Sequence, residues 1–97
     1  MGLILSIDLG TTLLRAGVFD VSGKMLCSGR RQLSIERPQE YAAEHNPAKV
    51  YAALLDICQE VVGAYKSQIS LVVPSSYQFG LILMDKQFNP VTGITTP

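Results

Sequence analysis

The chain has 97 residues, of which 47% are hydrophobic and 16% are charged, and this composition predicts a folded domain rather than a disordered segment. A chain of this length builds one small domain, which excludes a large two-domain enzyme. The 8 basic residues equal the 8 acidic ones in number and are scattered, so neither nucleic acid nor an anionic membrane is expected as a partner.

The start of the chain has no features of a signal peptide or membrane span. Its apolar run, residues 3–7, contains Ser6 and ends at Asp8, which is too short for either. Cys27 and Cys58 have neither a C-x-x-C spacing nor a neighbouring histidine, so we expect two buried thiols rather than a zinc site. These features predict a cytoplasmic protein.

The first third of the chain predicts three strands joined by hairpins. Residues 3–7 are typical of a central strand that is covered on both faces. Residues 13–19 resume extended character after the break at Gly10, and residues 20–24 supply a polar turn. Residues 25–35 alternate between two faces, with one face formed by Met25, Cys27, Gly29, Leu33 and Ile35.

A helix is predicted after the polar connector at residues 36–44. Asn46 is a favourable N-cap, and Pro47 suits the first helical position. Gly63 lies within the helical pattern, which runs to about Lys66, and we expect close packing or early fraying there. The apolar positions that recur at helical spacing are Val50, Tyr51, Leu54, Leu55, Cys58, Val61, Val62 and Tyr65.

The remaining segments complete a mixed sheet. Residues 69–73 are apolar and follow a helix, so they should pair in parallel with the first strand. Residues 81–84 predict a fifth strand, and a turn at 85–90 leads to the short segment 91–94. The predicted fold class is therefore α/β, in the order β-β-β-α-β-β. No helix follows to cover the second face of the sheet, so we expect an incomplete domain in which this face is exposed or is covered by a missing part.

The segment 8–12 carries the most informative chemistry. Asp8 ends a strand, and Gly10, Thr11 and Thr12 follow it in a turn. Glycine lets backbone amides approach an anion, threonine hydroxyls donate to phosphate oxygens, and Asp8 can hold Mg²⁺ directly or through its waters. The same residue types are also common in ordinary hairpin turns, so a purely structural role remains an alternative.

Together with Arg15, Asp20 and Gly23, this segment resembles the phosphate-binding hairpin of the actin, Hsp70 and sugar-kinase superfamily. The likeness is greatest to the FGGY carbohydrate kinases, of the xylulokinase and glycerol kinase type. It continues through residues 44–47 and 75–80 and on to 94–95, and so covers nearly all of residues 1–97. It implies a ribonuclease H-like fold, with the chain forming the amino-terminal part of the kinase's first domain.

The resemblance also implies transfer of the γ-phosphoryl group of ATP to a hydroxyl of a sugar or polyol. Asp8 would serve Mg²⁺, and Gly10, Thr11 and Thr12 would bind the phosphates. Arg15 would contact the nucleotide phosphates or a nearby carboxylate, and a surface salt bridge is its alternative role.

The expected substrate segment departs from the family pattern. Many members read Gln-Met-His-Gly where this chain has Tyr77, Gln78, Phe79 and Gly80, which makes a xylulose-type substrate less secure. Gln78 would bind a sugar hydroxyl and Phe79 would stack on a sugar face, although a core position for Phe79 is the alternative. His45, the only histidine, is expected at the surface or as a capping residue, without a functional role.

No general base is identified, because the catalytic aspartate of the family falls in a region that this chain does not reach. We therefore expect the isolated chain to be inactive. The alternative is a naturally short, non-catalytic module that acts by self-association through the exposed sheet face or by subunit pairing. An ATPase fragment of the Hsp70 or actin type is a third possibility.

Overall fold

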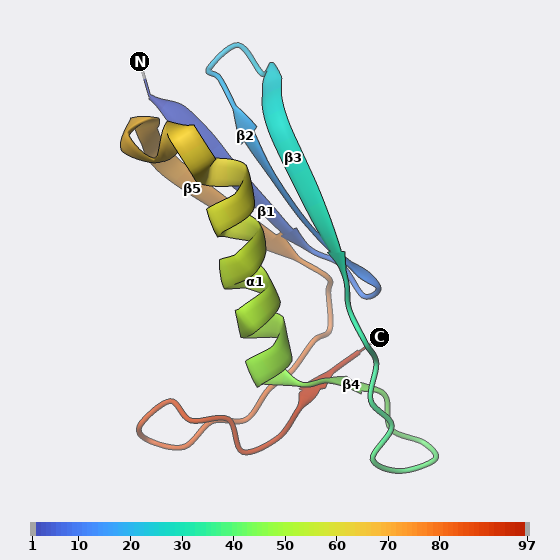
Figure 1. Cartoon of the computed structure of the whole chain (residues 1–97). Helices are drawn as coiled ribbons and strands as arrows, with labels where there is room; N and C mark the ends of the chain where they lie inside the picture. Colours follow the sequence, from blue (N-terminus) through green and yellow to red (C-terminus); the bar gives the residue numbers. More distant parts are fainter. Residues whose placement is uncertain (1, 97) are drawn as a thin grey trace.

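The computed structural model describes residues 2–96. Its main sheet has four strands in the order β3-β2-β1-β5, and β1 is antiparallel to β2 but parallel to β5. This arrangement confirms the mixed α/β sheet and the predicted parallel pairing (Figure 1). In chain order the elements are β1 (Leu3–Leu9), β2 (Leu13–Phe19), β3 (Met25–Gln32), β4 (Glu44–His45), α1 (Pro47–Val62), the 3₁₀ helix η1 (Gly63–Gln68), β5 (Ile69–Ser76) and β6 (Ile94–Thr95).

The turn between β2 and β3 forms as predicted. The Asp20 carboxylate accepts hydrogen bonds from the hydroxyl and N–H of Ser22 and from the N–H of Lys24. The Ser22 hydroxyl and these backbone donors hold the pKa of Asp20 below its usual value. A register shift between Val18 and Phe19 then places Met25 opposite Phe19. Met25 consequently leaves the face that holds Cys27, which the sequence alternation did not predict.

The N-terminus of α1 is capped as predicted. The Asn46 side chain accepts hydrogen bonds from the N–H groups of Ala48 and Lys49, at 3.0 and 3.3 Å. The α-helix ends earlier than expected, since Gly63 adopts a φ of 40° and its N–H donates to the Gln59 carbonyl. The chain continues through η1 before it enters β5.

Helix α1 covers one face of the sheet, as Figure 1 shows, and the core lies between them. Ile57 is fully buried there, whereas Tyr51 and Leu55 of the predicted apolar stripe are 61% and 46% exposed. The stripe was predicted too broadly, because only a narrow helix face meets the sheet. The buried apolar residues are Leu3, Leu5, Leu14, Ala16, Val18, Leu33, Ile57 and Val61.

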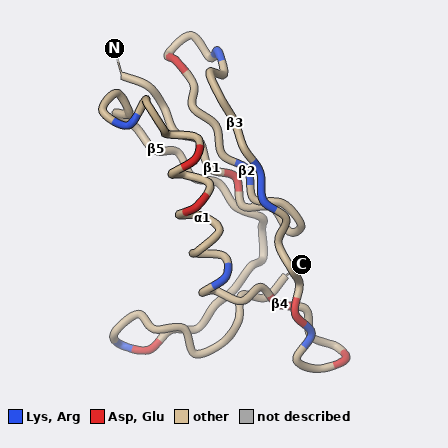
Figure 2. The backbone as a smooth tube through the Cα atoms, in the orientation of Figure 1, with Lys and Arg blue, Asp and Glu red and all other residues tan. Residues whose placement is uncertain are grey.

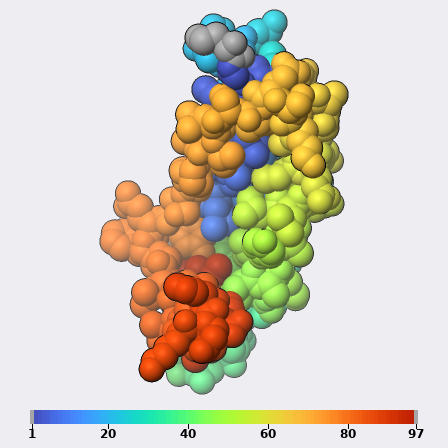
Figure 3. All heavy atoms as spheres, turned by 90° about the vertical axis from the view of Figure 1, so that its left-hand side faces the viewer, coloured from blue at the N-terminus to red at the C-terminus, as the bar shows by residue number. Residues whose placement is uncertain are grey.

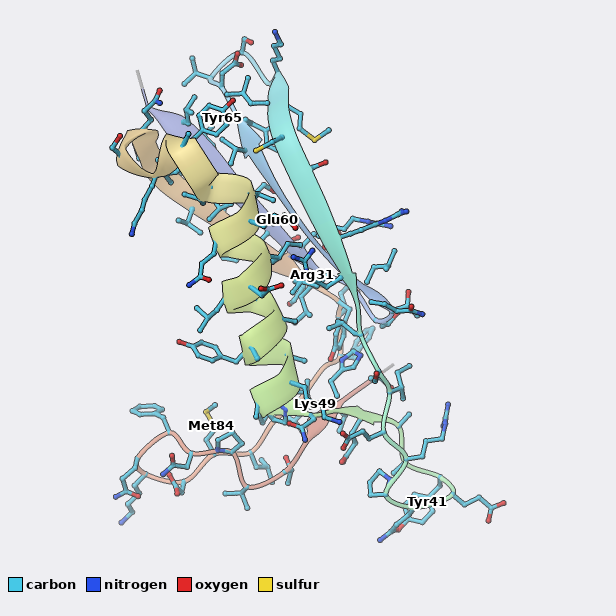
Figure 4. The ribbon with its side chains drawn as sticks, in the orientation of Figure 1. Arg31, Tyr41, Lys49, Glu60, Tyr65 and Met84 are labelled. Carbon is cyan, nitrogen blue, oxygen red and sulfur yellow. The ribbon has the colours of Figure 1, made fainter. Side chains whose placement is uncertain are left out.

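An ion-pair cluster joins β3 to α1. The Arg31 guanidinium lies 2.9 Å from the Asp56 carboxylate and 3.1 Å from the Glu60 carboxylate. In Figure 4, Arg31 reaches from β3 toward Glu60 on the helix. The hydrogen bonds that Arg31 donates to Glu60, and then to Asp56, raise the pKa of Arg31. These contacts give the helix a defined position on the sheet.

The opposite side of the four-stranded sheet, here called the outer face, has no covering layer among residues 2–96. Its concave part is lined by Ser6, Asp8, Arg15, Phe19 and Met25, among others. Along β5, Leu71 and Val73 are in register with Ile4 and Ser6 and are 52% and 45% exposed. The prediction of an exposed sheet face is confirmed, while the prediction that β1 is covered on both faces is wrong.

The segment after β5 forms a lobe below the sheet and helix (Figure 3). The predicted strand at 81–84 is absent, and Met84 makes only an isolated bridge with Pro90. The carbonyls of Leu83 and Leu81 accept backbone hydrogen bonds from Val91 and Thr95. Their N–H groups donate instead to the hydroxyls of Thr92 and Thr95, so the backbone ladder is only partly formed. Only β6 is regular there, and it pairs with β4.

Two further findings bear on the sequence predictions. Cys27 and Cys58 are unpaired and half-buried rather than fully buried. Among residues 2–96, no helix has both the length and the apolar character needed to cross a membrane.

Candidate functional site

The outer face carries an acidic side chain between a basic one and a hydroxyl. Asp8 on β1 is in register with Arg15 on β2 and with Ser75 on β5. Arg15 Nη1 lies 3.8 Å from Asp8 Oδ2, and the Ser75 hydroxyl donates to Asp8 Oδ1 at 3.2 Å. The side chains of Asp8 and Arg15 are 49% and 61% exposed, so both remain accessible to a ligand. The salt bridge foreseen as an alternative for Arg15 is therefore present, in a loose form.

Gly10 closes the turn that follows Asp8. Its N–H donates to the Leu13 carbonyl at 2.8 Å. A Cβ atom at Gly10 would lie 2.8 Å from that same carbonyl oxygen, so a larger residue would have to displace the backbone. Glycine is required here for close approach of two backbone segments, and this requirement explains why the turn can be so tight.

Two backbone donors of this turn are free. The carbonyls of Thr11 and Thr12 accept hydrogen bonds from the His45 ring and from the Leu33 N–H, at 2.8 Å each. The N–H groups of Thr11 and Thr12 have no acceptor among residues 2–96. Adjacent free N–H groups beside a glycine suit the oxygens of a phosphate. The turn therefore has the donors that its sequence predicted.

His45 departs most from the sequence prediction. It is completely buried, not at the surface, and both ring nitrogens have partners. Nε2 lies 2.8 Å from the Thr11 carbonyl oxygen, and Nδ1 lies 2.9 Å from the Tyr77 hydroxyl. Neighbouring positions in sequence gave no sign of this, because both partners are more than 30 residues away, at separations of 34 and 32.

Arg30 belongs to the site and was missed by the sequence analysis. It is in register with Arg15, and both line a concavity of about 540 Å³ on the outer face, with Asp8 and Ser28. Figure 2 shows basic positions on β3 beside an acidic position of the sheet. Counting from the turn, where Phe19 pairs with Met25, would have placed Gly29 opposite Arg15. The register shift between Val18 and Phe19 brings Arg30 to that position instead, so no local sequence signal could have found it.

Gln78 and Phe79 follow β5, at the edge of the sheet where β1 also ends. The Tyr77 N–H donates to the Leu9 carbonyl at 2.9 Å and thereby holds this segment next to the turn. Phe79 is 84% exposed and has a φ of 65°, so the alternative of a core position is wrong. Gln78 is also exposed. Both side chains are accessible near the carboxyl ends of two parallel strands.

Asp8 and the amides of the turn are the groups that could hold a magnesium nucleotide at this site. Magnesium commonly binds one or two carboxylates, phosphate oxygens and water. Asp8 supplies one half-exposed carboxylate next to the free amides. The described residues hold no cluster of three or more acidic, histidine or cysteine ligands. The residues therefore fit a metal held by one carboxylate, with phosphates and water completing its shell, and not a cage made only of protein groups.

Comparison with known proteins assigns a family. The chain is 31% identical over 84 residues to a glycerol kinase from Gloeobacter violaceus, an alignment covering 87% of this chain and 17% of that protein. Its fold matches a ligand-bound xylulose kinase from Lactobacillus acidophilus, with a TM-score of 0.89, 22% identity and coverage of 99% of this chain and 20% of that one. It also matches a Plasmodium falciparum glycerol kinase with ADP, with a TM-score of 0.81, 19% identity and coverage of 98% and 20%.

The two solved structures show the fold alone, and the chain spans about a sixth of the length of the glycerol kinase. Family membership follows from a family model instead. The model of the N-terminal domain of the FGGY carbohydrate kinases matches residues 3–96, which include the whole hairpin and the segment after β5. The chain thus belongs to the FGGY family of carbohydrate kinases.

Proposed function

We propose that the chain is the amino-terminal part of the first domain of an ATP-dependent carbohydrate kinase and that it supplies the phosphate-binding hairpin. The kinase transfers the γ-phosphoryl group of ATP to a hydroxyl of a sugar or polyol. The observation that carries this proposal is the pair of free N–H groups at Thr11 and Thr12 beside the accessible Asp8 carboxylate. Phosphoryl transfer depends mainly on positioning and charge stabilisation, which this hairpin is built to provide.

Each group at the hairpin has a role in this proposal. The N–H groups and hydroxyls of Thr11 and Thr12 donate to phosphate oxygens, and Gly10 permits the close approach. Asp8 holds the waters of Mg²⁺, which when bound neutralises charge on the phosphates. Arg15, supported by Arg30, adds positive charge on the outer face. Binding by this pair should weaken as salt concentration rises.

The segment after β5 is proposed to contact the phosphate acceptor. Gln78 carries both a hydrogen-bond donor and an acceptor, which suits a hydroxyl group. The exposed ring of Phe79 offers a flat apolar surface for a sugar ring. Relatives with these folds are named as glycerol, xylulose and gluconate kinases, and a small sugar or polyol is therefore the proposed substrate class.

The isolated chain is proposed to be inactive, and two of its carboxylates are poorly suited to act as a general base. Asp20 and Asp85 lie in turns and accept several hydrogen bonds, which lower the pKa of each. A carboxylate with a depressed pKa is a weak proton acceptor at neutral pH. The half-buried free thiols support a reducing, cytoplasmic location for the protein.

A kinase assay on a protein that joins these residues to the remainder of an FGGY kinase tests the proposal. We expect ATP consumption only when an acceptor from a panel of polyols and sugars is present. Asp8→Ala and Thr12→Ala should abolish turnover, whereas Glu40→Gln, at an exposed connector position, should leave it unchanged. Full activity of both site variants would contradict the proposal.

A second candidate function has one observation in its favour. Leu71, Val73 and Met25 expose apolar surface on the outer face, as a self-associating module would. In that case the 97-residue chain is a dimer or larger assembly in sedimentation at micromolar concentration. Association should then be weakened by Val73→Glu. A strictly monomeric and folded chain would rule this alternative out.

A further inference from the structure

His45 is the one fully buried polar side chain among residues 2–96, and the proposed chemistry gives it no role. A buried imidazole is costly unless both nitrogens are satisfied. In this chain both are satisfied, and the partners come from two different parts of the site. One is the backbone of the phosphate-binding turn, and the other is the side chain that begins the segment after β5.

The identity of the partners determines which ring nitrogen carries the proton. A carbonyl oxygen only accepts hydrogen bonds, so Nε2 must donate its proton to the Thr11 carbonyl. In the neutral ring Nδ1 then has a free lone pair, which accepts the proton of the Tyr77 hydroxyl. Burial raises the pKa of Tyr77, which keeps this hydroxyl protonated and able to donate.

The first hydrogen bond sets the direction of a phosphate donor. The peptide joining Thr11 to Thr12 is planar and trans, so its carbonyl and its N–H point in opposite directions. His45 holds the carbonyl toward the buried interior. The N–H of Thr12 must consequently point away from His45, on the side where the residue is exposed and no protein acceptor is present.

The second hydrogen bond anchors the segment after β5. Tyr77 is held at its backbone by the Leu9 carbonyl and at its hydroxyl by His45. Gly80 packs against its ring so closely that a Cβ atom there would lie 2.7 Å from Cε2 of Tyr77. Gln78 and Phe79 lie between these two contacts, so their backbone is tethered on both sides.

We propose that His45 is a positioning residue that links the phosphate-binding turn to the acceptor-binding segment, with one ring nitrogen orienting the Thr12 amide and the other holding Tyr77. This inference rests on the proposed function, because it assigns His45 to the same site. Neither role requires His45 to touch substrate or nucleotide.

Two substitutions separate the two contacts. His45→Gln places an amide N–H near the position of Nε2, so it keeps a donor for Thr11 and loses the acceptor for Tyr77. His45→Asn places a carbonyl oxygen near Nδ1, so it keeps the acceptor and loses the donor. Tyr77→Phe removes the hydroxyl alone, and Tyr41→Phe is its matched control at an exposed loop tip (Figure 4).

The test is a titration of the ¹⁵N-labelled chain with magnesium pyrophosphate, followed by the amide resonances of Thr12, Gln78 and Phe79. His45→Asn should weaken pyrophosphate binding about five- to tenfold, the effect of one lost hydrogen bond, and should shift the Thr12 resonance. His45→Gln and Tyr77→Phe should retain the affinity and shift the Gln78 and Phe79 resonances. A general loss of stability would not produce these opposite patterns.

Other outcomes are also decisive. If the unmodified chain binds pyrophosphate and all variants bind it equally, the positioning role is wrong while the proposed function stands. If the unmodified chain does not bind, both fall together. If His45→Asn fails to fold, the ¹⁵N spectrum of the His45 ring in the unmodified chain provides the test. A proton on Nδ1 instead of Nε2 would overturn the inference.

Discussion

At the scale of single residues, the candidate site depends on a few backbone contacts that only particular side chains permit. Gly10 is the clearest case, because its backbone approaches the Leu13 carbonyl too closely for a side chain. Gly10→Ala should lower the free energy of unfolding by about 1–3 kcal/mol, as in other overpacked sites. Chemical denaturation measures this change. Unaltered stability together with unaltered pyrophosphate binding would show that the turn tolerates a Cβ atom.

Tyr77 gives a prediction with a definite pH dependence. Its pKa is raised above 10.0 because burial disfavours the phenolate. The unfolded chain therefore loses this proton at lower pH than the folded chain. The stability that this shift contributes is fully present below the pKa of Tyr77 in the unfolded chain. It is lost as pH rises through the pKa of Tyr77 in the folded chain. In an alkaline titration followed by phenolate absorbance, Tyr77→Phe should remove an ionisation step whose midpoint lies above pH 10.0. Removal of a step with a midpoint below pH 10.0 would contradict this prediction.

Residue types within the hairpin predicted the polar turn but could not predict long-range partners. The salt bridge that was the alternative for Arg15 is found, because Arg15 lies opposite Asp8 on the neighbouring strand. The burial of His45 depends on Tyr77, which lies 32 positions away beyond a helix and a strand. No local pattern contains that information, which is why the sequence assigned His45 to the surface.

At the scale of elements, the start of α1 was easier to predict than its end or its buried face. Asn46 and Pro47 act locally, through a cap and a fixed φ, whereas the positive φ of Gly63 ends the α-helix earlier than its apolar pattern predicted. Which apolar residues are buried depends on how the helix lies on the sheet. The ion pairs of Arg31 contribute to that position, and they join residues 25 and 29 positions apart. Ile57 is consequently buried while Leu55 is not.

This difference can be measured with a matched pair of substitutions in α1. Ile57→Ala should cost about 2–5 kcal/mol of unfolding free energy, because it removes a fully buried side chain and leaves a cavity. Leu55→Ala removes a similar volume from a position that is 46% exposed and should cost clearly less. Thermal or urea unfolding of both variants provides the comparison. Equal losses would mean that the helix face has been assigned incorrectly.

The β-segments show the same contrast between local and distant causes. The turn that begins at Asp20 could be predicted from its residues, whereas the register shift at Phe19 could not, since it depends on the pairing of both strands. Residues 81–84 have the apolar character of a strand. Their carbonyls at Leu81 and Leu83 have backbone partners, but their N–H groups donate to the hydroxyls of Thr95 and Thr92, so the backbone ladder of a strand is incomplete.

At the scale of the whole molecule, the described residues are more open than a typical domain of this length. The Cα radius of gyration is 15.0 Å. About 12.5 Å is usual for this number of residues. The accessible surface is 6760 Å². About 5,400 Å² is usual for this mass. The uncovered outer face and the exposed lobe after β5 (Figure 1) both contribute to this difference, and the uncovered face also leaves the hairpin site accessible.

The central claim is that the end of the β1–β2 hairpin binds nucleotide phosphates. Titration of the ¹⁵N-labelled chain with ADP, in the presence and absence of Mg²⁺, tests it most directly. We predict that the largest shifts occur at the Thr11 and Thr12 amides, that Mg²⁺ increases the affinity, and that Asp8→Asn removes this increase. Saturating ADP that leaves both amides unchanged, or that shifts only residues on the α1 side of the sheet, would contradict the account.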